Sequence, residues 1–136
     1  MYFVYRKGRE MSSTAQPARI SQDAAIVSKA AVRAAERLEL PGRLFASIIG
    51  VSEATISRMK TGDFALDRDR NAFQLSLLFV RLYRSLDAIV GGNTASAASW
   101  FKSHNTALNA RPVDAVQSIS GLVHVIDYLD SRRAPL

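Results

Sequence analysis

Apolar residues recur along most of this chain at steps of three and four, the spacing that places them on one face of an α-helix. The first clear run follows Ser21, whose hydroxyl can accept a hydrogen bond from the free amides of a first helical turn. Its apolar positions are Val27, Ala31, Ala34 and Leu38. The pattern predicts an amphipathic helix that begins near Ser21 and ends before Pro41-Gly42.

Two short helices separated by a tight turn are predicted next. The first covers residues 42–49, and Gly50 ends it because glycine readily adopts the left-handed conformation of a helix C-terminus. Ser52 can cap the second helix, which ends at Gly62 after the basic Lys60. The apolar positions expected to face the core are Leu44, Phe45, Ile48, Ile49, Ile56 and Met59.

The rest of the chain predicts one long helix followed by three short ones. Asp67 to Asp69 bring negative charge to the start of the long helix, where the helix dipole favours it, and Gly91-Gly92 ends it. Its stripe consists of Leu75, Leu78, Phe79, Leu82, Leu86 and Ile89, and predicts either core packing or the seam of a dimer. The later helices are expected after the cap at Asn93, at 113–116 and at 122–129, with polar turns from His104 to Asp114.

Composition agrees with an all-α protein. The 136 residues include 20 Ala and 13 Leu, which favour helices, and the 48% of hydrophobic residues is enough to build a core. We expect a helix-turn-helix bundle at 20–66, joined by the long helix to a small C-terminal helical domain at 67–136. Residues 1–19 show no helical period beyond the first five positions and predict a basic, mobile arm.

The net charge of +6 fits a polyanionic partner, but half of it lies in residues 1–19, and the segment 20–66 carries only +1. Charge alone is therefore weak support for nucleic-acid binding. The chain has no cysteine, which excludes disulfide scaffolds, thiol nucleophiles and Cys-ligated zinc. No stretch reaches the roughly 18 apolar residues of a membrane span, so we expect a cytoplasmic protein.

The segment from Gly42 to Thr61 has the spacing of a helix-turn-helix. Such a unit needs a small residue where its helices touch, a residue that tolerates positive φ at the turn, and apolar anchors on the second helix. Ala46, Gly50, Ile56 and Met59 supply these features in order. The segment resembles the Xre-like helix-turn-helix proteins of phage repressor type, although Gly42 replaces the usual polar residue at the start of the motif.

With Ile56 and Met59 turned inwards, the opposite face of the second helix would enter a major groove. Arg58 can pair with guanine, Ser57 with several base edges, Ala54 with a thymine methyl and Glu53 with a cytosine amine. Phosphate contacts are expected from the N-terminus of this helix and from Ser52, Arg43 and Lys60. The predicted DNA-binding residues are Arg43, Ser52, Glu53, Ala54, Ser57, Arg58, Lys60 and Thr61. An ordinary two-helix corner with a solvated face is the alternative.

Three C-terminal stretches carry a second resemblance: Trp100 to Leu108, Asn109 to Asp114 and Gly121 to Leu129. They contain, in order, a helix with Trp, a polar turn with Asn, an Arg-Pro pair and a last helix opened by Gly. This order resembles that of the C-terminal toxin-binding domain of the Xre/MbcA/ParS antitoxins. Asn109-Ala110 stands where these relatives commonly have Gly-Gly. With the Xre-like half, the resemblance covers about residues 22 to 131.

The resemblance implies an antitoxin of a type II toxin-antitoxin pair. Its partner would be a RES-domain toxin, encoded by the adjacent gene, that consumes NAD or transfers a group from it. The C-terminal half would block the toxin's active site, and the N-terminal half would dimerise and repress the shared operon by binding operator DNA. The residues implied in toxin binding are Trp100, His104, Asn105, Leu108, Arg111, Pro112, Asp114, Tyr128, Arg132 and Arg133, with the stretch 131–136 expected to be a mobile cationic tail that reaches the dinucleotide site.

Structural roles are alternatives for several of these residues. Trp100 can belong to the core, Asn105 and Asp114 can cap helices, and Asp127 and Asp130 can form a solvated face. His104 and His124 have no carboxylate or thiol companions at ligand spacing, so no metal site is predicted.

Other functions remain open from the sequence. No phosphate loop, nucleophile elbow or acid-base pair is visible, so we expect neither catalytic residues nor a cofactor. The alternatives are a stand-alone helix-turn-helix repressor without a toxin partner, and a pure inhibitor whose helix-turn-helix serves only as an oligomer scaffold.

Overall fold

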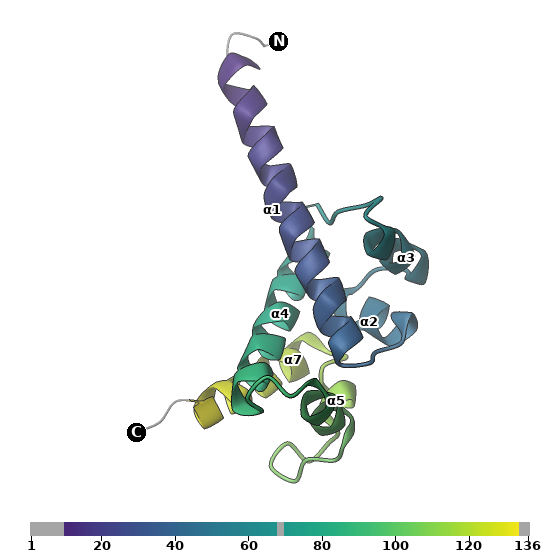
Figure 1. The fold of residues 1–136 in the computed structure, drawn as a ribbon, viewed down its shortest axis with the longest axis vertical. Coiled ribbons are helices and arrows are strands. Elements are labelled where there is room, and N and C mark those ends of the chain that lie inside the picture. Colours follow the sequence, from purple (N-terminus) through teal and green to yellow (C-terminus); the bar gives the residue numbers. More distant parts are fainter. Residues whose placement is uncertain (1–9, 68–69, 134–136) are drawn as a thin grey trace.

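The computed structural model describes residues 10–67 and 70–133 and shows an all-helical fold, as the sequence predicts (Figure 1). The helices, in chain order, are α1 (Glu10–Arg37), α2 (Gly42–Ile49), α3 (Glu53–Thr61), α4 (Asn71–Ile89), α5 (Thr94–Lys102), α6 (Pro112–Ala115) and α7 (Ile119–Arg133). The described residues contain no strand, only one isolated bridge between Asn105 and Ala110. None of these helices combines the length and apolarity needed to cross a bilayer.

Helix α1 is longer than the sequence pattern indicates. It begins at Glu10, so the prediction that residues 10–19 belong to an arm without helical structure is wrong; residues 1–9 lie outside the described residues. Adding turns to an existing helix requires no new nucleation, so a segment with weak apolar periodicity can continue one that is anchored by packing. The N-terminal half of α1 extends beyond the other helices (Figure 1).

The C-terminal end also differs from the prediction. Helix α7 continues to Arg133, so the expected mobile tail is wrong for residues 131–133, and residues 134–136 lie outside the described residues. Ser131 donates a hydrogen bond to the carbonyl of Tyr128 at 2.7 Å, and Arg133 donates one to the Ser85 hydroxyl at 3.0 Å. The Ser131 bond lies within α7, and the Arg133 bond holds the last turn of α7 against α4.

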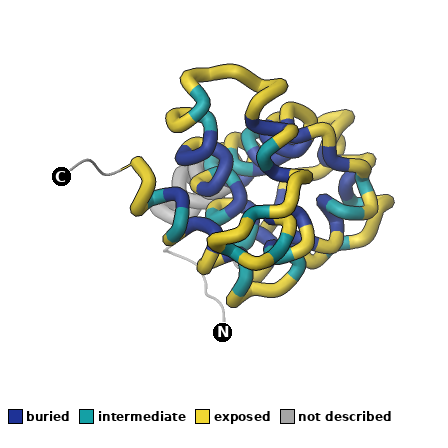
Figure 2. Tube along the Cα trace, turned by 90° about the horizontal axis from the view of Figure 1, so that it is seen from below, coloured by how far each residue is buried: buried dark blue, intermediate teal, exposed yellow. Residues whose placement is uncertain are grey.

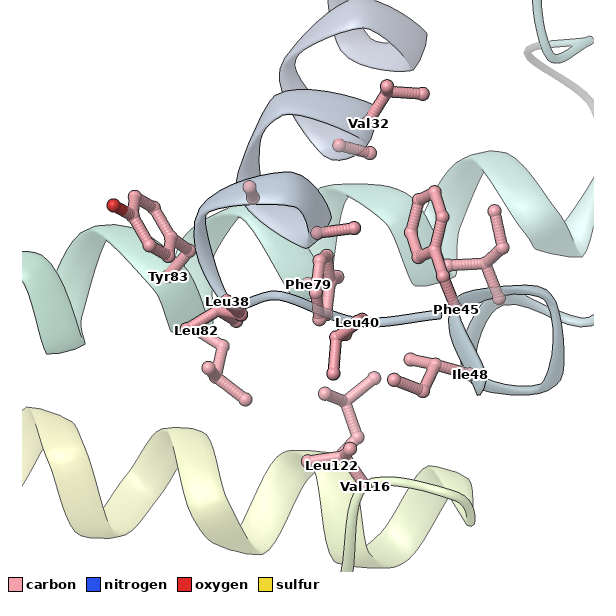
Figure 3. Close-up of a cluster of buried hydrophobic side chains, with 14 of the residues drawn as sticks. Val32, Leu38, Leu40, Phe45, Ile48, Phe79, Leu82, Tyr83, Val116 and Leu122 are labelled. Atoms are coloured by element: carbon pink, nitrogen blue, oxygen red, sulfur yellow. The ribbon is translucent and has the colours of Figure 1, made fainter. Parts of the chain in front are cut away.

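One hydrophobic core extends through both halves of the chain. In Figure 3, Phe45 of α2, Phe79 of α4 and Leu122 of α7 belong to one cluster of buried side chains, and the centroids of the two phenylalanine rings lie 5.4 Å apart. The buried positions form a continuous interior beneath an exposed outer surface (Figure 2). The N- and C-terminal halves therefore fold against each other, because each supplies part of the same core.

Helix α4 is the central element and packs against α1, α2, α5 and α7. Most of its predicted stripe is core, since Phe79, Leu82 and Leu86 are at most 1% exposed, whereas Ile89 is exposed. The negative charge predicted at the start of this helix is not in its first turn. Helix α4 begins at Asn71, so Asp67 precedes the helix, and the first turn contains no acidic residue. Helix α4 holds α7 directly, whereas α3 packs on α1 and α2.

Glycine is required at the corner between α6 and α7. A Cβ on Gly121 would lie 1.8 Å from the carbonyl oxygen of Ala115, so no larger residue fits without displacing backbone. The Gly121 amide donates to the Ser118 hydroxyl at 3.0 Å, which caps the start of α7. The Gly that opens the last helix thus allows α7 to approach the end of α6 closely.

Candidate nucleic-acid and partner-protein interfaces

The turn between α2 and α3 has the geometry predicted for a helix-turn-helix. Gly50 takes a left-handed conformation, with φ of 76°, and its amide bonds the Ala46 carbonyl at 2.8 Å. Ser52 caps α3, because its hydroxyl accepts a hydrogen bond from the Thr55 amide at 3.1 Å. Gly62 ends α3 with φ of 83°. All three sequence signals for the turn and caps are confirmed.

The inward-facing residues of the motif are also confirmed. Ile56 is 1% exposed and Met59 is 5% exposed, so both anchor α3 to the core. Ala46 is buried on α2, and a Cβ added to Gly42 would lie 3.9 Å from the Ile56 side chain. A side chain at Gly42 would therefore make only an ordinary contact with Ile56, and the burial of Ile56 and Met59 leaves the other side of α3 facing solvent.

The residues predicted to read DNA are all exposed in the described part of the chain. The exposed residues on or beside this helix are Arg43, Ser52, Glu53, Ala54, Ser57, Arg58, Lys60 and Thr61, which are the eight predicted DNA-binding residues. The structure brings the last seven together on one short helix and its cap, and places Arg43 in the first turn of α2.

Arg58 has two contacts that the sequence pattern did not indicate. Its guanidinium lies over the ring of Phe64, 5.4 Å from the centroid, and one of its nitrogens donates to the Thr55 hydroxyl at 3.4 Å. Phe64 lies beyond Gly62, outside the helical period, so the spacing of apolar residues gave no signal for it. Beside these residues, the segment Phe64–Asp67 and the start of α4 line an open cleft of about 530 Å³.

At the C-terminal half, an aromatic pair joins α5 to α7. The rings of Trp100 and Tyr128 stack with centroids 6.4 Å apart and planes inclined by 12°. Arg132 places its guanidinium 6.0 Å from the Tyr128 centroid. Both aromatic residues are half-buried, so each packs on the core and also presents an edge to solvent.

The turn between α5 and α6 is shaped by Asn105. Its side-chain oxygen accepts a hydrogen bond from the Leu108 amide at 3.0 Å, and its backbone pairs with Ala110 in both directions. Asn109 has φ of 54°, a left-handed conformation that Gly would adopt most easily, so Asn at this position retains the turn. His104 is exposed and Leu108 is half-buried on this turn. Asn105 therefore has a structural role whatever else it contacts.

Arg111 and Asp114 form an exposed ion pair across the first turn of α6, with two hydrogen bonds of 2.8 and 3.1 Å. The hydrogen bond from Arg111 lowers the pKa of Asp114 below its ordinary value, and the same contact raises the pKa of Arg111. Pro112 lies between them as the first residue of α6 and is buried. It can act on a partner only through the shape of the turn.

The solvated face expected for Asp130 is wrong. This carboxylate accepts hydrogen bonds from Ser85 at 2.7 Å and from Arg81 at 2.5 Å, which tie α7 to α4. The Ser85 hydrogen bond is the largest cause that lowers the Asp130 pKa, and Arg81 and Arg133 act in the same direction. Among the described residues, no group of three or more His, Asp or Glu side chains can hold a metal ion.

Two family models match this chain, one over the helix-turn-helix and one over the C-terminal half. The antitoxin Xre-like helix-turn-helix domain matches residues 19–81, and the antitoxin Xre/MbcA/ParS C-terminal toxin-binding domain matches residues 85–134. A search of curated proteins gave no match. These two families are not enzymatic, and their matches together include α3 and the Trp100–Tyr128 pair. The chain is an antitoxin that joins an Xre-like helix-turn-helix DNA-binding domain to an Xre/MbcA/ParS C-terminal toxin-binding domain.

Proposed function

We propose that this antitoxin neutralises a RES-domain, NAD-consuming toxin by covering the toxin's active site, and that it binds operator DNA to repress its own operon. The observation that carries the proposal is the succession of two antitoxin domains in one chain, each with an accessible surface. Neither role requires chemistry by the antitoxin itself.

The DNA-binding role is assigned to the exposed side of α3. Arg58 reads a guanine, Ser57, Ala54 and Glu53 contact neighbouring base edges, and Thr61 lies at the end of the same face. Arg43, Ser52 and Lys60 contact phosphates, which sets the register of the helix without reading sequence. A dimer would present two such helices to half-sites about one helical turn of DNA apart.

The toxin-binding role is assigned to the surface around Trp100 and Tyr128. Aromatic and Arg side chains are the residue types that most often dominate binding energy at protein interfaces, and this surface joins Trp100, Tyr128 and Arg132. The remaining implied residues lie on the α5–α6 turn, on α6, or at the end of α7. Because Arg132 and Arg133 belong to a helix, we propose that a helix end covers the dinucleotide site, in place of the extended tail predicted from sequence.

Co-expression with the product of the adjacent gene tests the toxin arm. The toxin alone should stop growth and deplete NAD, and the wild-type antitoxin should restore both. Absence of a RES-like neighbour, or a toxin that acts unchanged in the presence of the antitoxin, would contradict the proposal and favour a stand-alone repressor.

Two charge reversals separate the roles. Arg43→Glu should weaken operator binding and leave neutralisation intact, whereas Arg132→Glu should weaken neutralisation and leave operator binding intact, because the two exposed residues belong to different matched domains. Arg58→Ala should weaken operator binding by about 1 to 3 kcal/mol if Arg58 reads a guanine. Equal loss of both activities in either charge reversal would contradict the division of roles.

A further inference from the structure

Residues 62–67, which follow α3, are fixed in place at both ends. Near α3, the Asp63 amide bonds the Arg58 carbonyl at 3.0 Å, and the Thr61 hydroxyl donates to the Asp63 carboxylate at 3.0 Å. Near α4, Leu66 is 3% exposed and its amide donates to the buried hydroxyl of Ser28 on α1 at 2.8 Å. The backbone on either side of Phe64 is therefore held, by the end of α3 before it and by the buried Ser28 of α1 after it.

The Phe64 side chain is 37% exposed, although the backbone on both sides of it is held. Its ring lies under the Arg58 guanidinium. On the other side, Thr55 accepts a hydrogen bond from Arg58, and the Ser52 and Thr55 hydroxyls lie 3.0 Å apart, within hydrogen-bonding distance. The guanidinium is held between a ring and a hydroxyl, each of which is itself anchored.

We propose that Phe64 is a positioning residue for base reading: it holds Arg58 in the orientation in which Arg58 contacts DNA. The inference rests on the proposed DNA-binding function and adds a residue outside the eight assigned above. An Arg side chain has considerable rotamer entropy, and a guanidinium that is already held loses less of it on binding. A cation–π contact uses the charge of Arg58 and occupies none of its N–H donors, so those not bonded to Thr55 remain available to a guanine edge.

A double-mutant cycle tests the inference, using a duplex selected from randomised DNA by the wild-type protein. Phe64→Ala should weaken binding by about two- to five-fold, the range expected for an exposed cation–π contact. It should also reduce discrimination at the base pair where Arg58→Ala does so. In the Arg58→Ala background, Phe64→Ala should have no further effect. Equal effects of Phe64→Ala in both backgrounds would overturn the inference, because Phe64 would then act on DNA by itself.

Conservative variants separate the ring from general packing. Phe64→Tyr and Phe64→Trp keep an aromatic face and should bind like the wild type, whereas Phe64→Leu, which is apolar but has no ring, should behave like Phe64→Ala. Thermal unfolding should be nearly unchanged in all four variants. Full binding by Phe64→Leu would overturn the inference. Failure of the wild-type protein to select any duplex would instead remove the proposed DNA-binding function, and the inference with it.

Discussion

Gly121→Ala should destabilise the protein although it replaces Gly by the best helix former. In an unhindered helix this change is worth about 1 kcal/mol in favour of Ala. Here the new Cβ would lie 1.8 Å from the Ala115 carbonyl oxygen and 2.8 Å from its carbon, both of which are backbone atoms. The corner between α6 and α7 must therefore open.

The magnitude follows from three contributions. Overpacking costs about 1 to 3 kcal/mol, and opening the corner also strains the Ser118 cap on the Gly121 amide, which is worth about 0.5 to 2 kcal/mol. After subtraction of the helix-propensity gain of about 1 kcal/mol, we expect the free energy of unfolding to fall by about 0.5 to 4 kcal/mol.

Urea unfolding followed by circular dichroism measures this difference directly. The control is His124→Ala, an exposed residue of α7 three positions further on, which should change the free energy of unfolding by less than about 0.5 kcal/mol. If Gly121→Ala is as stable as the wild type, the argument from the close approach of α7 to Ala115 is refuted.

Three further changes probe other parts of the fold. Ser28→Ala leaves the buried Leu66 amide without its partner and should cost about 1 to 3 kcal/mol in chemical denaturation; a neutral result would show that another group accepts this hydrogen bond. Gly50→Ala places a side chain at φ of 76° and should lower the free energy of unfolding by about 1 to 2 kcal/mol in the same assay. The cause is backbone strain and not a clash, because the nearest atom to the new Cβ would lie at an ordinary 3.9 Å. An unchanged free energy of unfolding would contradict this prediction. Asp130→Asn should remove a part of the stability that depends on pH. Folding lowers the pKa of Asp130, so the carboxylate stabilises the fold fully above its ordinary pKa of about 4, and this stabilisation is lost as the pH falls through the lower folded-state pKa. Wild type and Asp130→Asn should therefore differ modestly at pH 7, by less than about 1 kcal/mol because the Asp130 side chain is one-third exposed. The difference should shrink as the pH falls below the ordinary carboxyl pKa, and a difference that stays constant in acid would count against the assignment.

Much of the helix-turn-helix could be predicted because its signals are local. The conformation of Gly50, the cap at Ser52 and the inward direction of Ile56 and Met59 depend on neighbours within one or two helical turns. Their spacing therefore indicates both the turn and the exposed face of α3. The same holds for Asn93, whose side chain caps α5 by accepting from the Ser96 amide at 2.9 Å.

Helix ends were harder to predict. The start of α1 at Glu10 and the continuation of α7 to Arg133 both extend beyond the apolar periodicity. Helix α7 continues because Ser85 of α4, far away in sequence, accepts a hydrogen bond from Arg133. No pattern within the last helix contains that information.

The sequence by itself determined the all-helical class, the turn between α2 and α3, and the resemblance of both halves to antitoxin domains, because each depends on residues close together along the chain. Only the tertiary structure decided that the halves share one core, that Asp130 ties α7 to α4, and that Phe64 lies under Arg58. The physical reason is the same in all three cases. These contacts depend on where the core holds backbone segments, and a hydrogen bond such as that from Leu66 to Ser28 joins residues 38 positions apart.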